Sequence, residues 1–158
     1  MATRANNRQV IDRIDLNVQA LVHTQMIKAL TKLANDVLEY AQERHEFKNR
    51  TFNAEDSYGY AIYYRGGVFV KTLSSPKATQ LKQVGGKAIS GHQTAEDFLN
   101  NYNAPSGYSL VVVAGVPYAA DLEDTFGLDV LTGSYNLARS SFEDVFRQVP
   151  LSNSFNRG

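Results

Sequence analysis

The stretch from Tyr108 to Asp124 constrains the fold of this chain more than any other part of the sequence. It begins with a run of uncharged aliphatic residues, Leu110 to Val113, between the turn-forming sequences Pro105-Ser106-Gly107 and Gly115-Val116-Pro117. A short aliphatic run between turn signals predicts a β-strand that is covered on both faces. The proline of the second turn cannot donate a hydrogen bond to a sheet, and its fixed φ suits the start of a helix from Tyr118 to Asp124. An acidic projection is therefore expected where this strand ends.

The second strong signal is the spacing of apolar residues between Val18 and about Glu46. They recur at helical intervals, with charged residues on the opposite face, and predict one long helix or two helices joined near His23-Thr24. Residues 1–17 are polar and show no sustained period, so we expect them to form a flexible N-terminal arm.

The middle of the chain carries the signals of a β-hairpin. Aromatic and β-branched residues in Ser57–Tyr64 and Val68–Leu73 flank the turn sequence Arg65-Gly66-Gly67. Residues 74–93 then predict a long basic loop, because they contain one proline and three glycines and show no clear period. A short helix is predicted to begin in the capping-box sequence Thr94-Ala95-Glu96-Asp97.

The last part of the chain predicts a short strand at Gly127–Thr132 and a helix from Tyr135 to about Gln148. The residues that we expect this helix to bury are Leu137, Ala138, Phe142, Val145 and Phe146. The order of elements predicts a single α+β domain over residues 18–150, followed by a tail at residues 151–158. Its small, mostly antiparallel sheet would include the hairpin, with the long N-terminal helix and the C-terminal helix packed on one face.

The 158-residue chain is 43% hydrophobic and 20% charged, which are ordinary values for a soluble globular domain. It has no cysteine, so disulfides and thiolate-bound metals are excluded. No apolar run reaches membrane-spanning length, and the first residues lack the apolar core of a signal peptide. We therefore expect a protein that assembles in the cytosol and has no membrane partner.

The zero net charge conceals an uneven distribution of charged residues. Residues 1–56 carry eight residues of each sign, residues 57–95 carry five basic residues and no acid, and residues 96–158 carry eight acids and three arginines. The basic residues of the middle segment are Arg65, Lys71, Lys77, Lys82 and Lys87, and the acidic projection carries Asp121, Glu123 and Asp124. One hypothesis is that the basic segment of one molecule contacts the acidic segment of the next, a head-to-tail contact of the kind that closes rings. The alternative is solvated surface with uneven loops.

Catalytic signals in the sequence are sparse. The three histidines lie far apart, without metal-ligand spacing: His23, His45 and His92. No metal or cofactor is therefore predicted. Asp36, Glu46 and Lys48 are similar to the acid-x-lysine core of some metal-dependent nucleases. That chemistry requires carboxylates fixed at a sheet edge, whereas these residues fall near the end of a predicted helix, so a nuclease is a minor alternative.

Two short motifs accompany the predicted elements. Arg50, Thr51 and Ser57 precede the predicted hairpin, where Phe52 and Ala54 occupy the third and fifth positions of the motif. Tyr118, Ala119 and Glu123 follow the predicted strand in the sequence Tyr-Ala-Ala-Asp-Leu-Glu. The motifs and the element order resemble the tail-completion or head–tail joining proteins in the neck of tailed bacteriophages. In that family the third and fifth positions of the first motif are Gly and Leu, so this chain meets the first motif only in part and the second in full.

The resemblance implies a non-enzymatic virion protein, assembled in the host cytoplasm, that forms a ring of about twelve copies in the neck. Such a ring would join the portal or an adaptor ring to tail proteins and surround the passing DNA without reading its sequence. In that setting the basic residues and the acidic projection would contact neighbouring subunits or line the DNA passage. A tail-terminator ring is the alternative within the same class.

Overall fold

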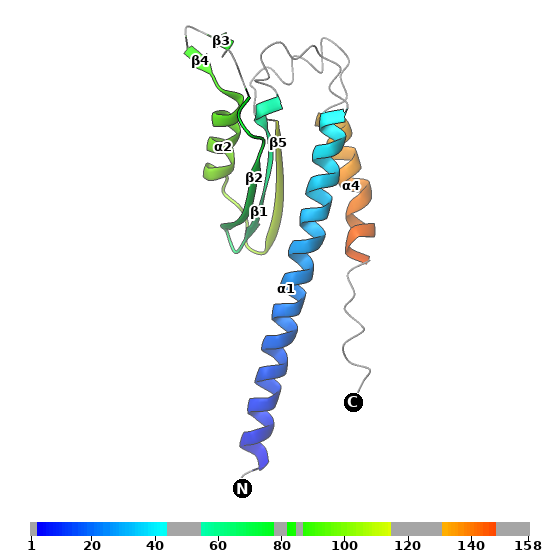
Figure 1. Ribbon diagram of the computed structural model, residues 1–158. Coiled ribbons are helices and arrows are strands. Elements are labelled where there is room, and N and C mark those ends of the chain that lie inside the picture. The colour runs from blue at the N-terminus through cyan, green and yellow to red at the C-terminus, as the bar shows by residue number, and fades with distance from the viewer. Residues whose placement is uncertain (1–2, 44–54, 78–81, 85–86, 115–130, 148–158) are drawn as a thin grey trace.

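The computed structural model describes residues 3–43, 55–77, 82–84, 87–114 and 131–147. Within these ranges it is an α+β structure of three α-helices, one 3₁₀ turn and five strands. In Figure 1 the long helix α1 (Thr3–Glu43) runs beside both the sheet and helix α4 (Leu131–Arg147). No helix in these ranges is long and apolar enough to cross a membrane.

The main sheet has three antiparallel strands in the order β2-β1-β5. Strand β1 (Tyr58–Tyr64) is central, and β2 (Gly67–Leu73) and β5 (Tyr108–Ala114) flank it. Ile62 is paired with both Val70 and Leu110, and a register shift between β1 and β2 follows directly after Ile62. Strand β5, which contains the aliphatic run Leu110–Val113, is therefore at the edge of the sheet, and the tyrosine-rich strand β1 is at its centre.

The predicted hairpin is confirmed. Its turn residues Arg65 and Gly66 have φ values of 53° and 81°, the positive pair that a tight two-residue hairpin turn requires. Glycine adopts this conformation without steric cost, which explains its place in the turn. The amide of Arg65 donates to the carbonyl of Gly107 at 2.9 Å, so the turn is held against the residue that precedes β5.

Helices cover both faces of the sheet, because the side chains of β1 alternate between two hydrophobic clusters. The cluster facing α1 contains the buried residues Leu30, Ala34, Tyr60 and Ile62. The cluster facing helix α2 (Gly91–Asn101) contains the buried residues Ala61, Tyr63, Ala95, Leu99 and Val113. The predicted α+β fold is confirmed, with α2 on the face of the sheet opposite α1, and the expected two-sided packing of β5 is confirmed by its contacts with both clusters.

The N-terminal prediction is wrong, because α1 begins at Thr3 and residues 3–17 are helical. The sequence contains no glycine or proline before Gly59, so nothing in it interrupts the helix. Apolar residues also occur before Val18, at Val10, Ile11, Ile14 and Leu16. The helix continues through Thr24, whose hydroxyl donates to the carbonyl of Ala20 at 2.9 Å, so the one-helix alternative holds.

Two further boundaries differ from the predictions. Helix α2 starts at Gly91, because the Ser90 hydroxyl caps it by accepting from the amide of Gln93 at 3.2 Å. Part of the predicted long loop forms a separate two-stranded sheet of β3 (Lys82–Val84) and β4 (Lys87–Ile89).

Helix α4 begins at Leu131, so the last two residues of the predicted strand at residues 127–132 are helical. Phe142 was expected to be buried but is 51% exposed. The expected acidic projection and the tail at residues 151–158 lie outside the described residues.

Candidate functional site

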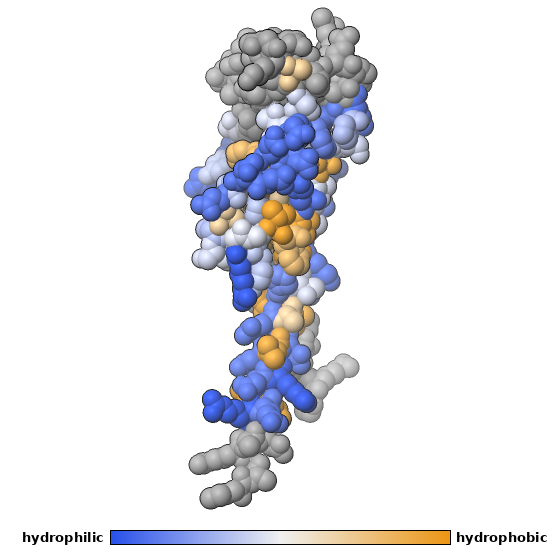
Figure 2. Space-filling view, turned by 90° about the vertical axis from the view of Figure 1, so that its left-hand side faces the viewer, coloured by the Kyte–Doolittle hydropathy of each residue, from blue (hydrophilic) through white to orange (hydrophobic). Residues whose placement is uncertain are grey.

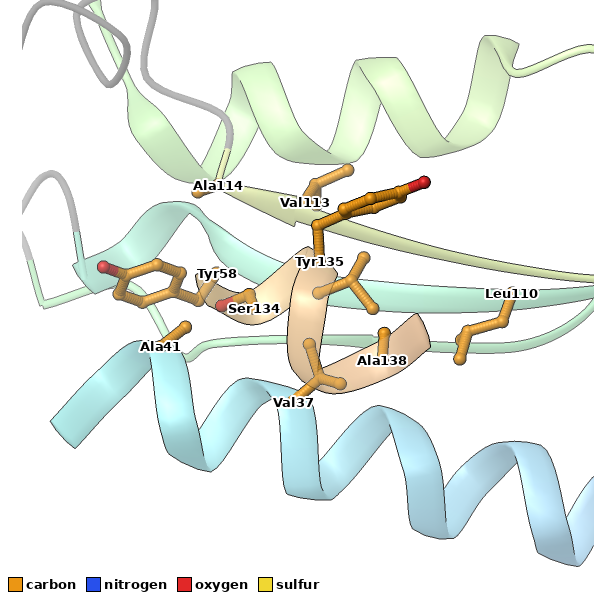
Figure 3. A pocket seen from close by; sticks show the side chains of 10 residues that line it. Val37, Ala41, Tyr58, Leu110, Val113, Ala114, Ser134, Tyr135 and Ala138 are labelled. Atoms are coloured by element: carbon orange, nitrogen blue, oxygen red, sulfur yellow. The ribbon is translucent and has the colours of Figure 1, made fainter. Parts of the chain in front are cut away.

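An apolar groove runs between β5 and α4, with α1 as its floor. It consists of two adjoining cavities of about 220 and 900 Å³ that share Leu110, Tyr135 and Ala138 in their linings. The smaller cavity lies over the C-terminal half of α1, where Val37 and Ala41 line it together with residues of β1, β5 and α4 (Figure 3). The larger cavity is lined further along by apolar and aromatic side chains and by one residue of each charge: Met26, Leu30, Leu33, Tyr108, Phe142, Phe146, Arg139 and Glu143. We call the two cavities together the β5–α4 groove.

The groove arises because α4 packs along α1 and leaves the outer edge of β5 uncovered by described residues. Helices α1 and α4 lie side by side in Figure 1, and Figure 3 shows residues of α4 between α1 and β5. Ala138 is small and allows close approach to the floor of the groove, whereas Tyr135 and Phe142 remain 64% and 51% exposed beside it. Large exposed aromatic side chains beside an apolar hollow are typical of protein-binding surfaces.

Ser134 contributes a polar group to this apolar lining. Ser134 lines the smaller cavity and is 8% exposed, and its hydroxyl oxygen has no hydrogen-bond partner among the described residues. A buried hydroxyl without a partner costs about 1–3 kcal/mol, so a bound group that could hydrogen-bond to it would gain from doing so. The hydroxyl is therefore a candidate recognition point within the groove.

Strand β5 presents an unprotected edge beside the groove. Among the described residues it pairs with β1 alone, and its sequence Tyr-Ser-Leu-Val-Val-Val-Ala contains no charge. The opposite edge strand, β2, carries Lys71, and its pairing with β1 contains a register shift. Both features hinder pairing with a further strand. The β5 edge lacks such protection and is suited to contact with another polypeptide.

An aromatic cluster around His23 joins the middle of α1 to the hairpin end of the sheet. The imidazole Nδ1 lies 2.6 Å from the Tyr108 hydroxyl, and the rings of Tyr64 and Phe69 lie within 4.9 Å of the His23 ring. Burial raises the pKa of Tyr108 above its ordinary value, and neighbouring Tyr64 adds to this effect. These contacts pack the middle of α1 against the hairpin end of the sheet.

The other histidines do not join this cluster. His92 Nδ1 lies 3.0 Å from the carbonyl of Ser74, and His45 lies outside the described residues. No group of three or more residues able to bind a metal is found within the described ranges. Asp36 pairs with Lys32 at 3.0 Å on the exposed side of α1, while the nuclease candidates Glu46 and Lys48 lie outside those ranges.

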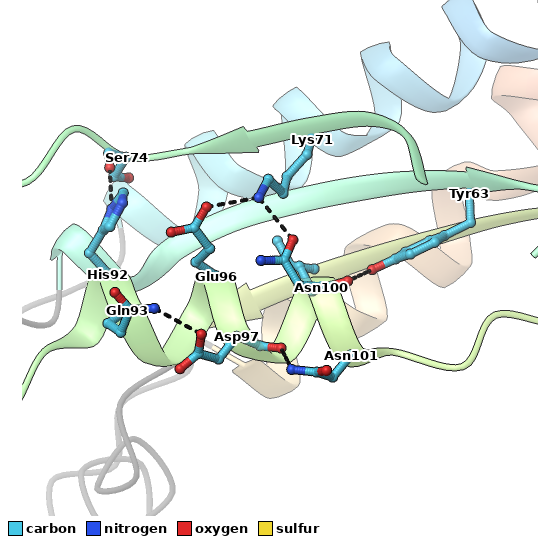
Figure 4. A network of polar contacts seen from close by, with 10 residues as sticks. Tyr63, Lys71, Ser74, His92, Gln93, Glu96, Asp97, Asn100 and Asn101 are labelled. Atoms are coloured by element: carbon cyan, nitrogen blue, oxygen red, sulfur yellow. Dashed lines mark hydrogen bonds and ion pairs between the residues drawn. The ribbon is translucent and has the colours of Figure 1, made fainter. Parts of the chain in front are cut away.

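The predicted basic residues are not gathered at one place. Lys71 donates to Glu96 Oε1 at 2.9 Å and to Asn100 Oδ1 at 3.0 Å, which connects β2 to α2 (Figure 4). The hydrogen bond from Lys71 lowers the pKa of the Glu96 carboxyl, and the positive charge of Lys71 adds to this shift. Lys71 therefore contributes to packing within the molecule and is a weaker candidate for an intersubunit contact than the sequence predicts.

The remaining basic candidates lie at the hairpin turn, in the segment after β2 and in the small β3–β4 sheet. Arg65 lies over the ring of Tyr64 at 5.0 Å, at the hairpin turn. The backbone amide of Lys77 donates to both carboxylate oxygens of buried Asp56 at 2.7 Å, and the Lys77 residue itself is exposed. Lys82 and Lys87 belong to the β3–β4 sheet.

The acidic candidates and most residues of the two motifs cannot be placed. Asp121, Glu123 and Asp124 lie outside the described residues, as do Arg50, Thr51, Tyr118 and Ala119. Ser57 is fully buried in the 3₁₀ turn Glu55–Ser57, directly before β1. The predicted contact between basic and acidic segments thus remains a prediction.

The groove is not predicted from the sequence, from which we expect β5 to be covered on both faces and Phe142 to be buried. A signal was present in α4, because its apolar residues include Tyr135 and Phe142 in addition to those needed for one packed face. The arrangement offers apolar contact, hydrogen bonding at a strand edge and one unpaired hydroxyl, which suits binding of a polypeptide.

Comparison of the chain with protein-family models, with curated proteins and with solved structures finds no match.

Proposed function

We propose that this protein is a structural component of the neck of a tailed bacteriophage, where it forms a ring that joins the portal or an adaptor ring to the tail. The observation that supports this most is the β5–α4 groove, an extended apolar surface beside an uncharged strand edge. Such a surface suits a lasting protein–protein contact. The resemblance of the two sequence motifs to the neck family supplies the biological setting.

The proposed ring requires a head-to-tail contact, in which one surface of each subunit meets a different surface of the next. The groove would supply one of these two surfaces. Lys77, Lys82 and Lys87 are the basic residues that we assign to the neighbouring subunit or to the DNA passage, since Lys71 is already paired within the molecule. The proposed ring has no catalytic role and binds DNA without sequence preference.

The test compares two phenylalanines of similar exposure on different surfaces. Phe142 lies in the groove and is 51% exposed, whereas Phe98 lies on α2 and is 53% exposed. The mass of each purified variant would be measured alone and after mixing with portal rings, heads or tails. Phe142→Ser should abolish stoichiometric binding or ring formation, and Phe98→Ser should bind like the wild type.

Two outcomes would contradict the proposal. One is a wild-type protein that stays monomeric and binds no virion component, and the other is equal binding by both variants. Binding to isolated tail tubes but not to portal-containing heads would favour the tail-terminator alternative.

A further inference from the structure

Strand β5 is less covered than β1, and its outer edge borders the β5–α4 groove. Six of the seven residues of β1 are buried, whereas Val113 is the one buried residue within β5. Val113 packs in the cluster that faces α2, and Val112 packs against the cluster that faces α1. Both residues nevertheless line the smaller cavity, so this cavity reaches around the outer edge of the strand (Figure 3). A further strand paired with this edge would therefore place its side chains in the groove.

The shape of the groove defines the kind of segment that fits it. Figure 2 shows the side of the molecule that carries α2, where hydrophilic residues predominate and apolar residues lie among them in separate patches. The groove instead runs without a break from Tyr108 and Phe146 at one end to Ala114 and Ser134 at the other. It follows the seven residues of β5, a length of about 23 Å. The fitting occupant is an extended segment of about seven residues with apolar side chains on one face.

The chain itself contains a segment of this pattern, directly after α4. Residues 148–158, which we call the trailing segment, have the sequence Gln-Val-Pro-Leu-Ser-Asn-Ser-Phe-Asn-Arg-Gly and lie outside the described residues. Its apolar side chains are Val149, Leu151 and Phe155, and the positions between them carry only Pro, Ser and Asn. In an extended strand these three apolar side chains share one face, because the period is two. Residues 149–155 also match β5 in number.

Pro150 is compatible with a strand at the edge of a sheet and sets which residues pair. Proline has no backbone N–H, so in sheets it is confined to edge strands, with that position directed away from the neighbouring strand. With Pro150 directed outwards, Val149, Leu151 and Phe155 are the residues that bond to β5. The outward proline also hinders pairing of yet another strand with the segment, so the sheet would grow by one strand only.

The position of Pro150 favours the groove of a second copy over the groove of the same molecule. The groove runs back along α4 from Phe146 towards Ser134, so a chain entering its own groove must reverse direction after Arg147. A reverse turn takes four residues and favours proline at the second of them, which places the turn at residues 149–152. Phe155 would then be the one apolar residue left for the groove. The groove of another copy can receive all three.

We propose that residues 149–155 of one copy pair with β5 of the next copy and place Val149, Leu151 and Phe155 in its β5–α4 groove. The contact is head-to-tail, because the trailing segment of each copy meets the groove of another. The inference rests on the proposed function in taking the groove as the contact between ring subunits. It adds the identity of the second surface.

The first experiment measures self-association of the full chain by sedimentation equilibrium over a wide range of concentration. The segment variant combines Leu151→Ser with Phe155→Ser and removes two of the three apolar side chains. Its matched control combines Gln148→Ser with Asn156→Ser, which changes two residues of the opposite face. The segment variant should raise the dissociation constant about tenfold or more, and the control should stay near the wild-type value.

The second experiment mixes two variants that each fail to associate alone. Phe142→Ser damages the groove and keeps the trailing segment, whereas the segment variant keeps the groove. In the mixture one contact is intact, from the segment of the Phe142→Ser chain to the groove of the other chain. The mixture should therefore form heterodimers that grow no further. A groove-to-groove contact would leave the mixture dissociated and would overturn the proposal.

Introduced cysteines report which copy supplies the segment, since the chain has none of its own. Leu151→Cys mixed with Ala138→Cys, which lies in the groove, should form a disulfide between two chains. A single chain carrying both changes should form linked oligomers. An internal disulfide in that chain would show that the segment occupies its own groove, and the proposal would be wrong.

A wild-type protein that stays monomeric at every concentration would also overturn the proposal, and so would equal association of the segment variant and its control. In either case the proposed function still stands if Phe142→Ser abolishes binding to portal rings, heads or tails and Phe98→Ser does not. Conversely, segment-to-groove association of a protein that binds no virion component would support this inference and contradict the proposed function.

Discussion

Removal of the Tyr63 hydroxyl tests how the sheet holds helix α2. Tyr63 is 1% exposed, and its hydroxyl donates to the carbonyl of Leu99 at 2.6 Å (Figure 4). Because α2 ends at Asn101, the Leu99 carbonyl is among the last four of the helix, which have no partner within it. A side chain of the central strand β1 thus donates a hydrogen bond, within the core, to a carbonyl at the C-terminal end of α2.

Tyr63→Phe should lower the free energy of unfolding by about 1–3 kcal/mol, because it leaves a buried carbonyl without a donor. For a domain of this size each kcal/mol corresponds to a fall in Tm of about 2–4 °C. Urea unfolding followed by circular dichroism would measure the loss. Tyr135→Phe is the control, since it removes the hydroxyl of a residue that is 64% exposed and should change stability by less than about 0.5 kcal/mol.

The same hydroxyl predicts a pH dependence. Burial raises the pKa of the Tyr63 phenol above its usual value of 10.0, and Tyr102 adds to the shift. Since the folded state favours the neutral phenol, its contribution is complete below about pH 10 and is lost as the pH rises through the raised pKa. The stability difference between wild type and Tyr63→Phe should therefore shrink in alkali. Equal losses for Tyr63→Phe and Tyr135→Phe at neutral pH would refute the reasoning.

Three further substitutions follow from the described contacts. Ser134→Ala should leave the free energy of unfolding unchanged or raise it by about 1 kcal/mol, because it removes a buried unpaired hydroxyl, and a clear loss in urea unfolding would show that the hydroxyl is bonded. Ser90→Ala should cost about 0.5–2 kcal/mol by removing the N-cap of α2, whereas Ser140→Ala, at an exposed position inside α4, should cost less because Ser140 caps no helix. Ile62→Ala should cost about 2–5 kcal/mol, since Ile62 is fully buried at the centre of the sheet, and a loss below 1 kcal/mol in thermal unfolding would contradict the packing described here.

Elements with local signals could be predicted from the sequence. The turn at Arg65-Gly66 was predictable because its backbone conformation has a direct residue requirement. The helical core of α1 was predictable from its apolar period, and β5 from its aliphatic run. The start of α2 also has a local signal, since the Ser90 hydroxyl caps it with Gln93 at the third helical position, but the Thr94 sequence carries a competing capping-box signal four residues later.

The central strand, the face that each helix covers and the position of the groove follow from three-dimensional packing and have no local signal. Strand β5 and β1 are both apolar enough to be central, and the choice depends on pairing between residues more than 40 positions apart. Likewise, the sequence predicts an exposed cation at Lys71, whereas in the fold α2 places Glu96 and Asn100 within hydrogen-bond distance of it. Local propensity acts within a few residues, whereas a groove is the space left between elements that are distant in the sequence, so its position follows from their packing.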